Sequence, residues 1–409
     1  QVEDHLAGMR EFKQVAEWDL SKKDKFQPQG ETAPFDMRLE SFEEYFSHLD
    51  PPPVISNKIF KRAMKIAVTH LKLNGNLEPI SCDEVVKRGL ADQKYGTSSG
   101  YSLFLKRKNP KAIEEAISSV ETRRCLSDKY PFTVGSRAQM GKVRELARFI
   151  FMASMGVNLF GMRFSQPLQD HLRIIGEPLF LPWDGWNAVQ QEISQRWHEA
   201  PVRFGADYTK MDQHFNIHHG KVVFEVIKHA FNKKYWDDLW ESTSYVFRAP
   251  VLTSKGYVDQ EHALLSGSEW TNLIETVWNY VFILYLNLKY GIKFLSSMGI
   301  GDDQLWSVTG ITTSAARKWL LKTVIREFET AGLPGNAEKQ DGIEDPETSA
   351  FLQRKVWTNY NGPDDKVVAA GVYSLVKVPF RINLASHISN ERVHLCCNNL
   401  IIWAIIISP

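Results

Sequence analysis

The chain has 409 residues, 43% of them hydrophobic and 12% aromatic, which is enough for a large folded interior and more than one subdomain. Its 49 basic and 48 acidic residues leave a net charge of +1, so overall charge does not indicate a polyanion partner, although local basic clusters still can. Four cysteines without a CxxC pair argue against a cysteine-rich zinc site and favour a reduced, intracellular setting.

Helical patterns dominate the first part of the chain. The first 50 residues are charged, and the proline run at 50–54 breaks the chain, so we expect residues 1–58 to form an amino-terminal extension. Apolar residues recur at steps of three and four over 57–73 and 112–126, which predicts two helices. Residues 130–165 are typical of a strand followed by a helix, with basic residues along both.

The second part of the chain alternates short strands with helices. Between 201 and 310 the predicted strands end in acidic residues, and 293–298 has the pattern of one such strand. Residues 350–357 and 367–378 are also predicted to be strands. No stretch reaches the roughly 18 apolar residues of a membrane span, and the apolar run at 400–408 is too short, so we expect no membrane partner.

Two pairs of acidic residues follow apolar strands. Asp207 and Asp212 lie in VRFGADYTKMDQHF, and Asp302 and Asp303 lie in GIGDDQLW. If a helical turn follows Asp207, Asp212 returns to the same face about one turn later. Two strands therefore deliver carboxylates to one edge of a sheet.

Carboxylates packed this closely repel each other unless a cation neutralises them. Hard oxygen ligands favour Mg²⁺ or Mn²⁺. Two such ions about 3.5–4 Å apart activate an attacking oxygen and stabilise a leaving one, so the pattern predicts nucleotidyl transfer or phosphodiester hydrolysis. The alternative is that Gly-Asp-Asp forms only a hairpin turn, and the upstream acid pair disfavours that reading.

The order of these motifs resembles that of viral RNA-dependent RNA polymerases. DYTKMD is similar to the first palm motif of that family, SGSEWTNLIETVWN to the second and GDD to the third. In the second motif Ser266, Gly267 and Thr271 match, whereas Glu275 stands where the family has asparagine. An acid there is similar to the polymerases of small double-stranded RNA viruses, the picobirnaviruses and partitiviruses. It puts in doubt whether the asparagine contact with the sugar is made in the same way.

Four further motifs extend the resemblance to about residues 95–356. GNAEKQ would make Lys339 the proton donor to the pyrophosphate leaving group. Lys142 and Arg144 in GKVR would face the triphosphate. Arg354 in AFLQRKV would contact the product RNA. The motif GTSSGYS would contact the template through Thr97, Ser98, Ser99 and Gly100.

The resemblance implies an α+β right-hand fold with an antiparallel palm sheet backed by helices. It further implies two Mg²⁺ or Mn²⁺ ions as cofactors. The partners would be template and product RNA, ribonucleoside triphosphates and a viral capsid protein, in the virion interior or host cytoplasm. The expected domain bounds are a 1–58 extension, fingers at 59–190 with an insertion at 229–262, palm at 191–228 and 263–356, and thumb at 357–409.

Each acidic residue has an expected role. Asp207 and Asp302 would bind the metals directly, with Asp303 as a weaker ligand. Asp212, helped by Ser266 and Thr271, would accept a hydrogen bond from the 2′-OH and so favour ribonucleotides; Glu275 lies in the same motif. Gly267 would let the backbone approach the template or sugar closely.

Two alternatives stay open. A reverse transcriptase would be expected to carry a bulky aromatic residue near the sugar, where this chain has Asp212. An inactive polymerase-like RNA-binding or packaging subunit would be expected to have lost an acid.

His214, His218 and His219 resemble a metal cluster on one helix, but we interpret them as structural or solvated. Trp236, Trp240, Trp270 and Trp278 are interpreted as core residues, and Arg137 and Arg148 remain unassigned.

Overall fold

The computed structural model describes most of the chain between residues 34 and 357. The described ranges are 34–127, 130–137, 148–196, 199–335, 348–352 and 354–357, with Glu17, Ala337, Gln340 and Ile343. Lys142, Arg144, Lys339 and the predicted strand at 367–378 lie outside the described residues, as do the predicted thumb and the apolar run at 400–408.

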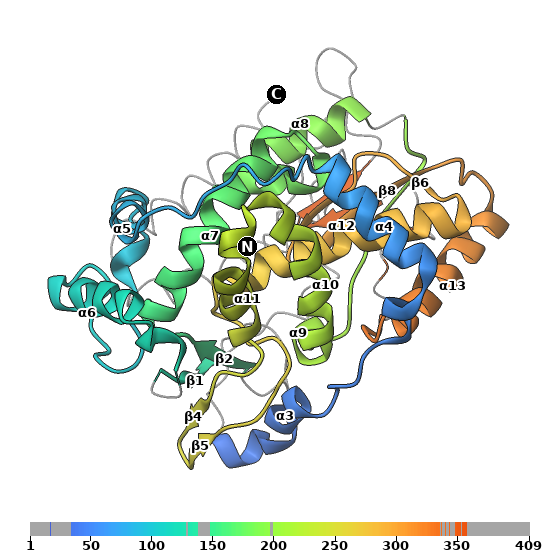
Figure 1. Ribbon diagram of the computed structural model, residues 1–409. Coiled ribbons are helices and arrows are strands. Elements are labelled where there is room, and N and C mark those ends of the chain that lie inside the picture. Colours follow the sequence, from blue (N-terminus) through green and yellow to red (C-terminus); the bar gives the residue numbers. More distant parts are fainter. Residues whose placement is uncertain are drawn as a thin grey trace.

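Helices make up most of the described chain (Figure 1). The α-helices are α3 (Leu39–Glu43), α4 (Lys58–His70), α5 (Cys82–Ala91), α6 (Pro110–Glu121), α7 (Met155–Ile174), α8 (Trp186–Arg196), α9 (Met211–His214), α10 (Ile217–Ile227), α11 (Trp236–Tyr245), α12 (Trp270–Tyr290) and α13 (Ser314–Thr330). The 3₁₀ helices used below are η2 (Phe35–Arg38), η3 (Glu44–Phe46) and η7 (Pro178–Asp184). The helices predicted over 57–73 and 112–126 are thus confirmed as α4 and α6.

Within the described ranges, the strands form two four-stranded sheets and a hairpin. Their bounds are β1 (Phe132–Arg137), β2 (Arg148–Met152), β3 (Val202–Gly205), β4 (Val251–Thr253), β5 (Gly256–Val258), β6 (Lys293–Phe294), β7 (Met298–Ile300), β8 (Asp303–Thr309), β9 (Thr348–Phe351) and β10 (Arg354–Trp357). The single strand predicted over 293–298 is wrong. Ser296 adopts a left-handed φ of 57°, which ends β6 before β7 begins.

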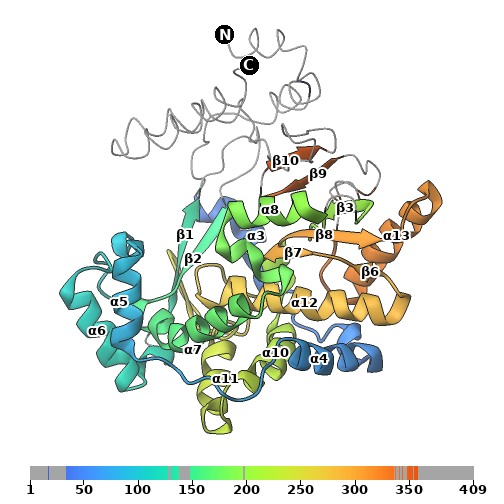
Figure 2. The same ribbon diagram turned by 90° about the horizontal axis from the view of Figure 1, so that it is seen from above.

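The sheet that carries the acids is antiparallel throughout, with β3 and β6 on either side of β8 and β7 paired to β8. Side chains alternate along β8. The Trp306 ring packs against Phe282 of α12 and Phe328 of α13, whereas Leu305 joins a separate cluster with Ile193 of α8 and Phe351 of β9. The sheet is therefore covered on both faces (Figure 2), and the expected antiparallel sheet backed by helices is confirmed.

Helix α12 is the centre of the main core. It is apolar on nearly every side, which is typical of a helix enclosed by protein. Trp270 and Trp278 are fully buried, and the Trp278 ring contacts Phe60 of α4 and Phe215. The helix ends at Gly291, whose φ of 68° closes the last turn.

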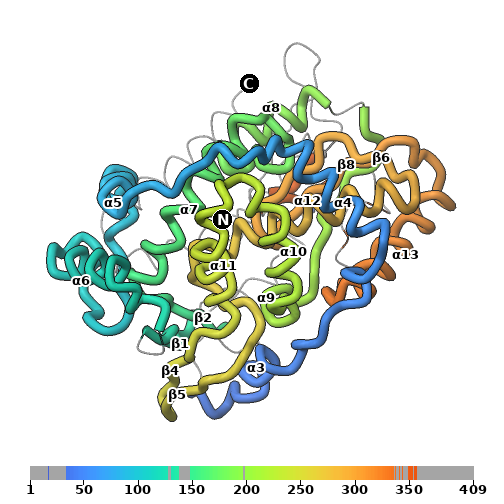
Figure 3. The backbone as a smooth tube through the Cα atoms, in the orientation of Figure 1, coloured from blue at the N-terminus to red at the C-terminus, as the bar shows by residue number. Residues whose placement is uncertain are grey.

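The segment between α4 and α5 crosses the molecule from one side to the other (Figure 3). The amide of Gly75 donates to the carbonyl of His229 at 2.7 Å, and the amide of Ile80 donates to the carbonyl of Arg163 at 2.9 Å. These bonds attach the crossing segment to the chain after α10 and to α7. Within the described ranges, no helix combines the length and hydropathy that crossing a bilayer requires.

A buried ionic group joins α12 to α13. The Glu327 carboxylate on α13 is 2% exposed and accepts hydrogen bonds from the Lys289 ammonium at 2.9 Å, from the Tyr285 hydroxyl at 2.7 Å and from the Tyr290 hydroxyl. Burial alone would raise the pKa of Glu327, but the hydrogen bonds from Tyr290, Tyr285 and Lys289 outweigh it and lower the pKa. The charged carboxylate thus stabilises the fold.

We predict that Glu327→Gln lowers the free energy of unfolding by about 3 kcal/mol at pH 7, because it leaves the Lys289 charge without its partner. Since the folded pKa is depressed, the contribution of Glu327 is present above the ordinary glutamate pKa and is lost as pH falls through the lowered value. Urea unfolding at several pH values measures it.

Arg326→Gln is the control for this prediction. Arg326 is 60% exposed and lies beside the same carboxylate, so its loss is expected to cost less than about 1 kcal/mol. Equal destabilisation by the two substitutions would contradict the prediction.

Candidate active site

The β7–β8 hairpin closes in a two-residue turn that lies within the Gly-Asp-Asp sequence. Ile300 pairs with Asp303, so Gly301 and Asp302 make the turn between them. Across the sheet Gly205 pairs with Leu305, and the Ala206 amide donates to the Gln304 carbonyl at 3.1 Å. One further step in this register brings Asp207 opposite Asp303. The structure therefore brings Asp207, Asp302 and Asp303 to one edge of the sheet.

Burial and neighbouring acids raise the pKa of both Asp302 and Asp303. Burial, then the charges of Asp302 and Asp207, raise the pKa of Asp303 to about 6. Burial and the charge of Asp212 raise the pKa of Asp302, although its side chain is exposed at the tip of the turn. Negative charge is therefore concentrated at this edge of the sheet.

Four polar side chains in the first half of α12 face the Gly-Asp-Asp turn or the loop of Asp207. The Gly301 amide donates to the Thr276 hydroxyl at 2.9 Å, and the Asn279 amide group donates to the Gly301 carbonyl at 3.1 Å. A Cβ on Gly301 would lie 2.9 Å from the Glu275 carboxylate and 3.1 Å from the Asn272 amide. Glu275 is therefore packed directly under the turn, and burial, Asp302 and Asp212 raise its pKa.

The loop of Asp207 is fixed to the same helix. The buried Tyr208 hydroxyl donates to Asn279 at 2.6 Å, so Asn279 contacts both acidic loops. On the other side, the Gln340 side chain donates to the Asp207 carbonyl at 2.8 Å, and the Thr209 amide donates to the Pro334 carbonyl at 2.7 Å. The backbone on both sides of Asp207 is thus held in place.

Asp212 lies in α9, after a left-handed residue at Lys210 with φ 51°. Its carboxylate accepts a hydrogen bond from the Tyr45 hydroxyl at 2.6 Å and one from the Gln213 amide at 3.1 Å. Burial raises the pKa of Asp212, and the hydrogen bond from Tyr45 and the charge of Arg148 partly oppose this. Asp212 thus lies close enough to Asp302 and Glu275 to influence their ionisation.

The loop that contains Ser266 and Gly267 docks on strand β2. The Phe151 amide contacts the Ser266 hydroxyl at 3.4 Å. Gly267 has φ 91°, and a Cβ there would lie 2.0 Å from the Phe151 carbonyl, so only glycine fits. The Thr271 hydroxyl donates to the Leu265 carbonyl at 3.0 Å and closes the loop onto the start of α12.

The sequence alone assigns no role to Arg148, and the structure places its charge near the acids. It is the exposed first residue of β2, and its charge lowers the pKa of both Asp212 and Asp302. The closeness of Arg148 in sequence to the GKVR motif is the signal that could have predicted this position. The contacts of Thr276, Asn279 and Tyr45 were also missed, although polar residues at helical spacing on an apolar helix point to the first two.

Two predicted RNA-contacting groups lie outside this cluster. Thr97, Ser98, Ser99 and Gly100 form a loop tied to α7, because the Met155 amide donates to the Ser99 carbonyl at 2.8 Å. Gly100 has φ 69°, and a Cβ there would lie 2.8 Å from the Ala153 carbonyl. Arg354 lies on β10, and its guanidinium stacks 4.3 Å from the Trp186 ring.

The sequence pattern indicated that the three histidines share one helix, but the structure divides them between α9 and α10. Asn216 caps α10 and separates His214, at the end of α9, from His218 and His219. The His219 ring is buried between Asn216 and the Ala331 carbonyl, and burial lowers its pKa to about 4. His214 stacks on His48. The interpretation of His219 as structural is confirmed.

The donors at the sheet edge suit a divalent cation in chemistry. Within the described part of the chain, no three His, Cys, Asp or Glu side chains are already gathered as a metal site. The observation that fits a metal is the raised pKa of Asp303, caused partly by Asp302 and Asp207, because a cation would relieve that repulsion. Carboxylate oxygens are the ligands that Mg²⁺ and Mn²⁺ prefer.

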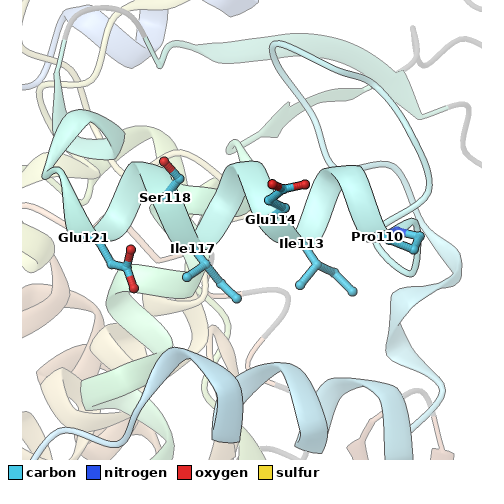
Figure 4. Close-up of a pocket in the computed structure, with 6 residues that line it drawn as sticks. All are labelled: Pro110, Ile113, Glu114, Ile117, Ser118 and Glu121. Carbon is cyan, nitrogen blue, oxygen red and sulfur yellow. The ribbon is translucent and has the colours of Figure 1, made fainter.

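A cavity of about 570 Å³ lies along α6, on a different part of the molecule. Figure 4 shows Ile113 and Ile117 pointing from the same side of this helix, with Glu114 and Glu121 at the lining. None of the predicted functional residues lines it, so it is not part of the acidic site.

We predict that Gly301→Ala lowers the free energy of unfolding by about 2–4 kcal/mol, because it combines a positive φ of 66° with a Cβ pressed against Glu275. Gly310→Ala is the matched control, since Gly310 has φ 77° and nothing within 4 Å of its Cβ position. Its expected cost is about 1–2 kcal/mol. Equal costs in denaturant titration would mean that the turn does not press on Glu275.

Comparisons with known proteins agree with this geometry. A sequence model described as viral RNA-dependent RNA polymerase matches residues 91–369. The crystal structure of the RNA-dependent RNA polymerase of a human picobirnavirus superposes with a TM-score of 0.71 at 20% identity, covering 91% of this chain and 70% of that one. Its insertion loop deletion mutant gives a TM-score of 0.71 at 21% identity, with 91% and 72% covered.

No curated protein matches the chain in sequence. The likeness to the picobirnavirus structures shows a shared right-hand fold, and the family match covers more than half of the 409 residues. The chain therefore belongs to the viral RNA-dependent RNA polymerase family and is an RNA-directed RNA polymerase.

Proposed function

We propose that this polymerase replicates and transcribes a viral RNA genome by two-metal nucleotidyl transfer from ribonucleoside triphosphates to an RNA 3′-OH. The observation that carries the proposal is the meeting of Asp207, Asp302 and Asp303 at one sheet edge, where burial and mutual repulsion raise the pKa of Asp303 to about 6. Two Mg²⁺ or Mn²⁺ ions, when bound, would activate the 3′-OH and stabilise charge on the departing pyrophosphate.

The acids have unequal roles in this proposal. Asp207 and Asp302 bind the ions directly, and Asp303, which is paired with Ile300 in the hairpin, contributes less. The hydrogen bonds that Gly301 makes with Thr276 and Asn279 support this assignment, because they fix the turn that carries Asp302. Lys339 donates the proton to pyrophosphate, and Lys142 and Arg144 bind the triphosphate, as the motifs imply.

Ribose selection falls to the Asp212 carboxylate. It accepts a hydrogen bond from the 2′-OH, a group that only a ribonucleotide carries. The electrostatic proximity of Asp212 to Asp302 and Glu275 supports a place beside the reacting nucleotide. Ser266, Thr271 and Glu275 complete this surface, with the buried Glu275 under the turn in place of the asparagine of the family motif.

The remaining assignments follow the family. Thr97 to Gly100 contact the template and Arg354 contacts the product RNA. The fingers comprise 59–190 and 229–262, the palm 191–228 and 263–356, and the thumb 357–409. Synthesis takes place in the virion interior or host cytoplasm, with a viral capsid protein as a partner.

We predict that Asp302→Asn lowers the rate of RNA synthesis by roughly 10³-fold or more, because the loss of a charged metal ligand costs several kcal/mol of transition-state stabilisation. Asp303→Asn should cost roughly 10- to 100-fold. The measurement is incorporation of the four ribonucleotides on a defined single-stranded RNA template with Mg²⁺ or Mn²⁺.

Two controls and two contradicting outcomes separate this proposal from its alternatives. Asp259→Asn removes an acid of the β5–Ser266 loop that has no assigned role and should leave synthesis unchanged. Deoxynucleotides should not support product, which excludes a reverse transcriptase. Full activity of Asp302→Asn would refute the metal assignment, and a folded wild-type chain that binds RNA without synthesis would favour an RNA-binding subunit.

A further inference from the structure

Residues 35–50, here named the strap, pack against strand β2. Phe35 and Phe42 contact the Phe149 ring at centroid distances of 5.6 and 5.7 Å. The buried Arg38 guanidinium lies 4.2 Å from the same ring and donates to the Ser136 hydroxyl of β1 at 2.5 Å. The strap thereby covers the strand on which the Ser266–Gly267 loop also docks.

The second half of the strap holds the turn that carries Asp212. The Gln213 side-chain amide donates to the Ser41 carbonyl at 3.3 Å, and the Asn216 amide donates to the carbonyls of His48 and Asp50, both at 2.9 Å. Gln213 and Asn216 both follow Asp212 in sequence, so these contacts fix the chain directly after it. The strap therefore joins β2 to the Asp212 turn.

Tyr45 is the strap residue that reaches the carboxylate itself. It is 3% exposed, its ring packs on Phe151 at 4.9 Å, and its carbonyl accepts from the Ala263 amide at 2.6 Å. Its hydroxyl donates to Asp212 Oδ2 at 2.6 Å. Burial and the charge of Asp212 raise the pKa of Tyr45 well above its ordinary value, so the hydroxyl keeps its proton and remains a donor.

Each oxygen of the Asp212 carboxylate thus accepts a hydrogen bond from a different partner. The Gln213 amide contacts Oδ1 and Tyr45 contacts Oδ2. An ionised carboxylate has about four lone-pair sites, so it can accept a further hydrogen bond while both contacts persist. Without the Tyr45 bond the carboxylate could rotate, and the orientation of its remaining lone pairs would no longer be fixed.

We propose that Tyr45 is a positioning residue for ribose selection, whose hydroxyl orients the Asp212 carboxylate toward the 2′-OH of the incoming nucleotide. This rests on the proposed function of Asp212. Tyr45 itself does not touch the reacting atoms, and its effect passes entirely through the carboxylate. Nucleotide choice then depends on a segment outside the motifs that identify the family.

The test is single-nucleotide extension of an RNA primer–template by the full chain, with ATP and 2′-deoxy-ATP compared opposite a template uridine. Discrimination is the ratio of the two kcat/KM values. Tyr45→Phe keeps the ring against Phe151 and removes only the hydroxyl. We expect discrimination to fall about tenfold, through a higher KM for ATP, with the deoxynucleotide little changed. Both kcat/KM values come from one preparation, so a loss of folded protein lowers both equally and leaves their ratio unchanged.

Glu44→Gln is the matched control on the same 3₁₀ helix. It breaks the exposed ion pair of Glu44 with Lys210 without touching Asp212, and discrimination should stay at the wild-type value. If it lowers discrimination as much as Tyr45→Phe does, a general effect of strap docking replaces the proposed effect through Asp212.

A double-mutant cycle gives the second readout. In an Asp212→Ala background, Tyr45→Phe should change discrimination no further, because the carboxylate through which it acts is gone. An unchanged ratio for Tyr45→Phe in the wild-type background, or an equal further loss in the Asp212→Ala background, would overturn the inference and leave the polymerase function intact. A wild-type chain that incorporates neither nucleotide would overturn both.

Discussion

Buried backbone groups must find hydrogen-bond partners, and in this protein that requirement decides where the Gly-Asp-Asp turn lies. The turn rests on α12, whose Thr276 and Asn279 satisfy the amide and carbonyl of Gly301. An apolar helix at the centre of the core must therefore carry a polar stripe at helical spacing. Because Asn279 also accepts from Tyr208, one helix sets the distance between the two acidic loops.

Strand β2 has a comparable role on the other side of the acids. It begins at Arg148, whose charge reaches Asp212 and Asp302. Its Phe149 and Phe151 support the strap, while the backbone of Phe151 receives the Ser266–Gly267 loop. Two chain segments distant in sequence, the strap and the Ser266–Gly267 loop, therefore meet on the five residues of β2. A displacement of β2 would disturb the Asp212 turn and the serine–glycine loop together.

The sequence was sufficient for features that leave a local pattern. The helices α4 and α6 follow from apolar spacing, and the two acid pairs follow from their places after apolar strands. The resemblance to the polymerase family was also readable from ordered motifs, and the family match confirms it. The roles assigned to Lys142, Arg144 and Lys339 stay predictions.

Features that depend on tertiary contact were not readable. The left-handed Ser296 splits a segment whose composition is typical of one strand. The Tyr45–Asp212 hydrogen bond joins residues 167 positions apart, so neither residue's neighbours signal it. Glu275 departs from the family motif in the sequence itself, but its place beneath Gly301 follows only from the packing of the hairpin on α12.

The wide sequence separation of the strap from its partners has a consequence for how the protein forms. During synthesis, Phe35, Phe42 and Tyr45 leave the ribosome long before β2 and the Asp212 turn exist to receive them. Contacts of such long range form late and slowly. Until then the three aromatic side chains are exposed to solvent, where chaperones or other nascent chains can bind them. Assembly of a fold competent for nucleotide selection therefore ends with a segment that is translated before the strand and the turn on which it docks.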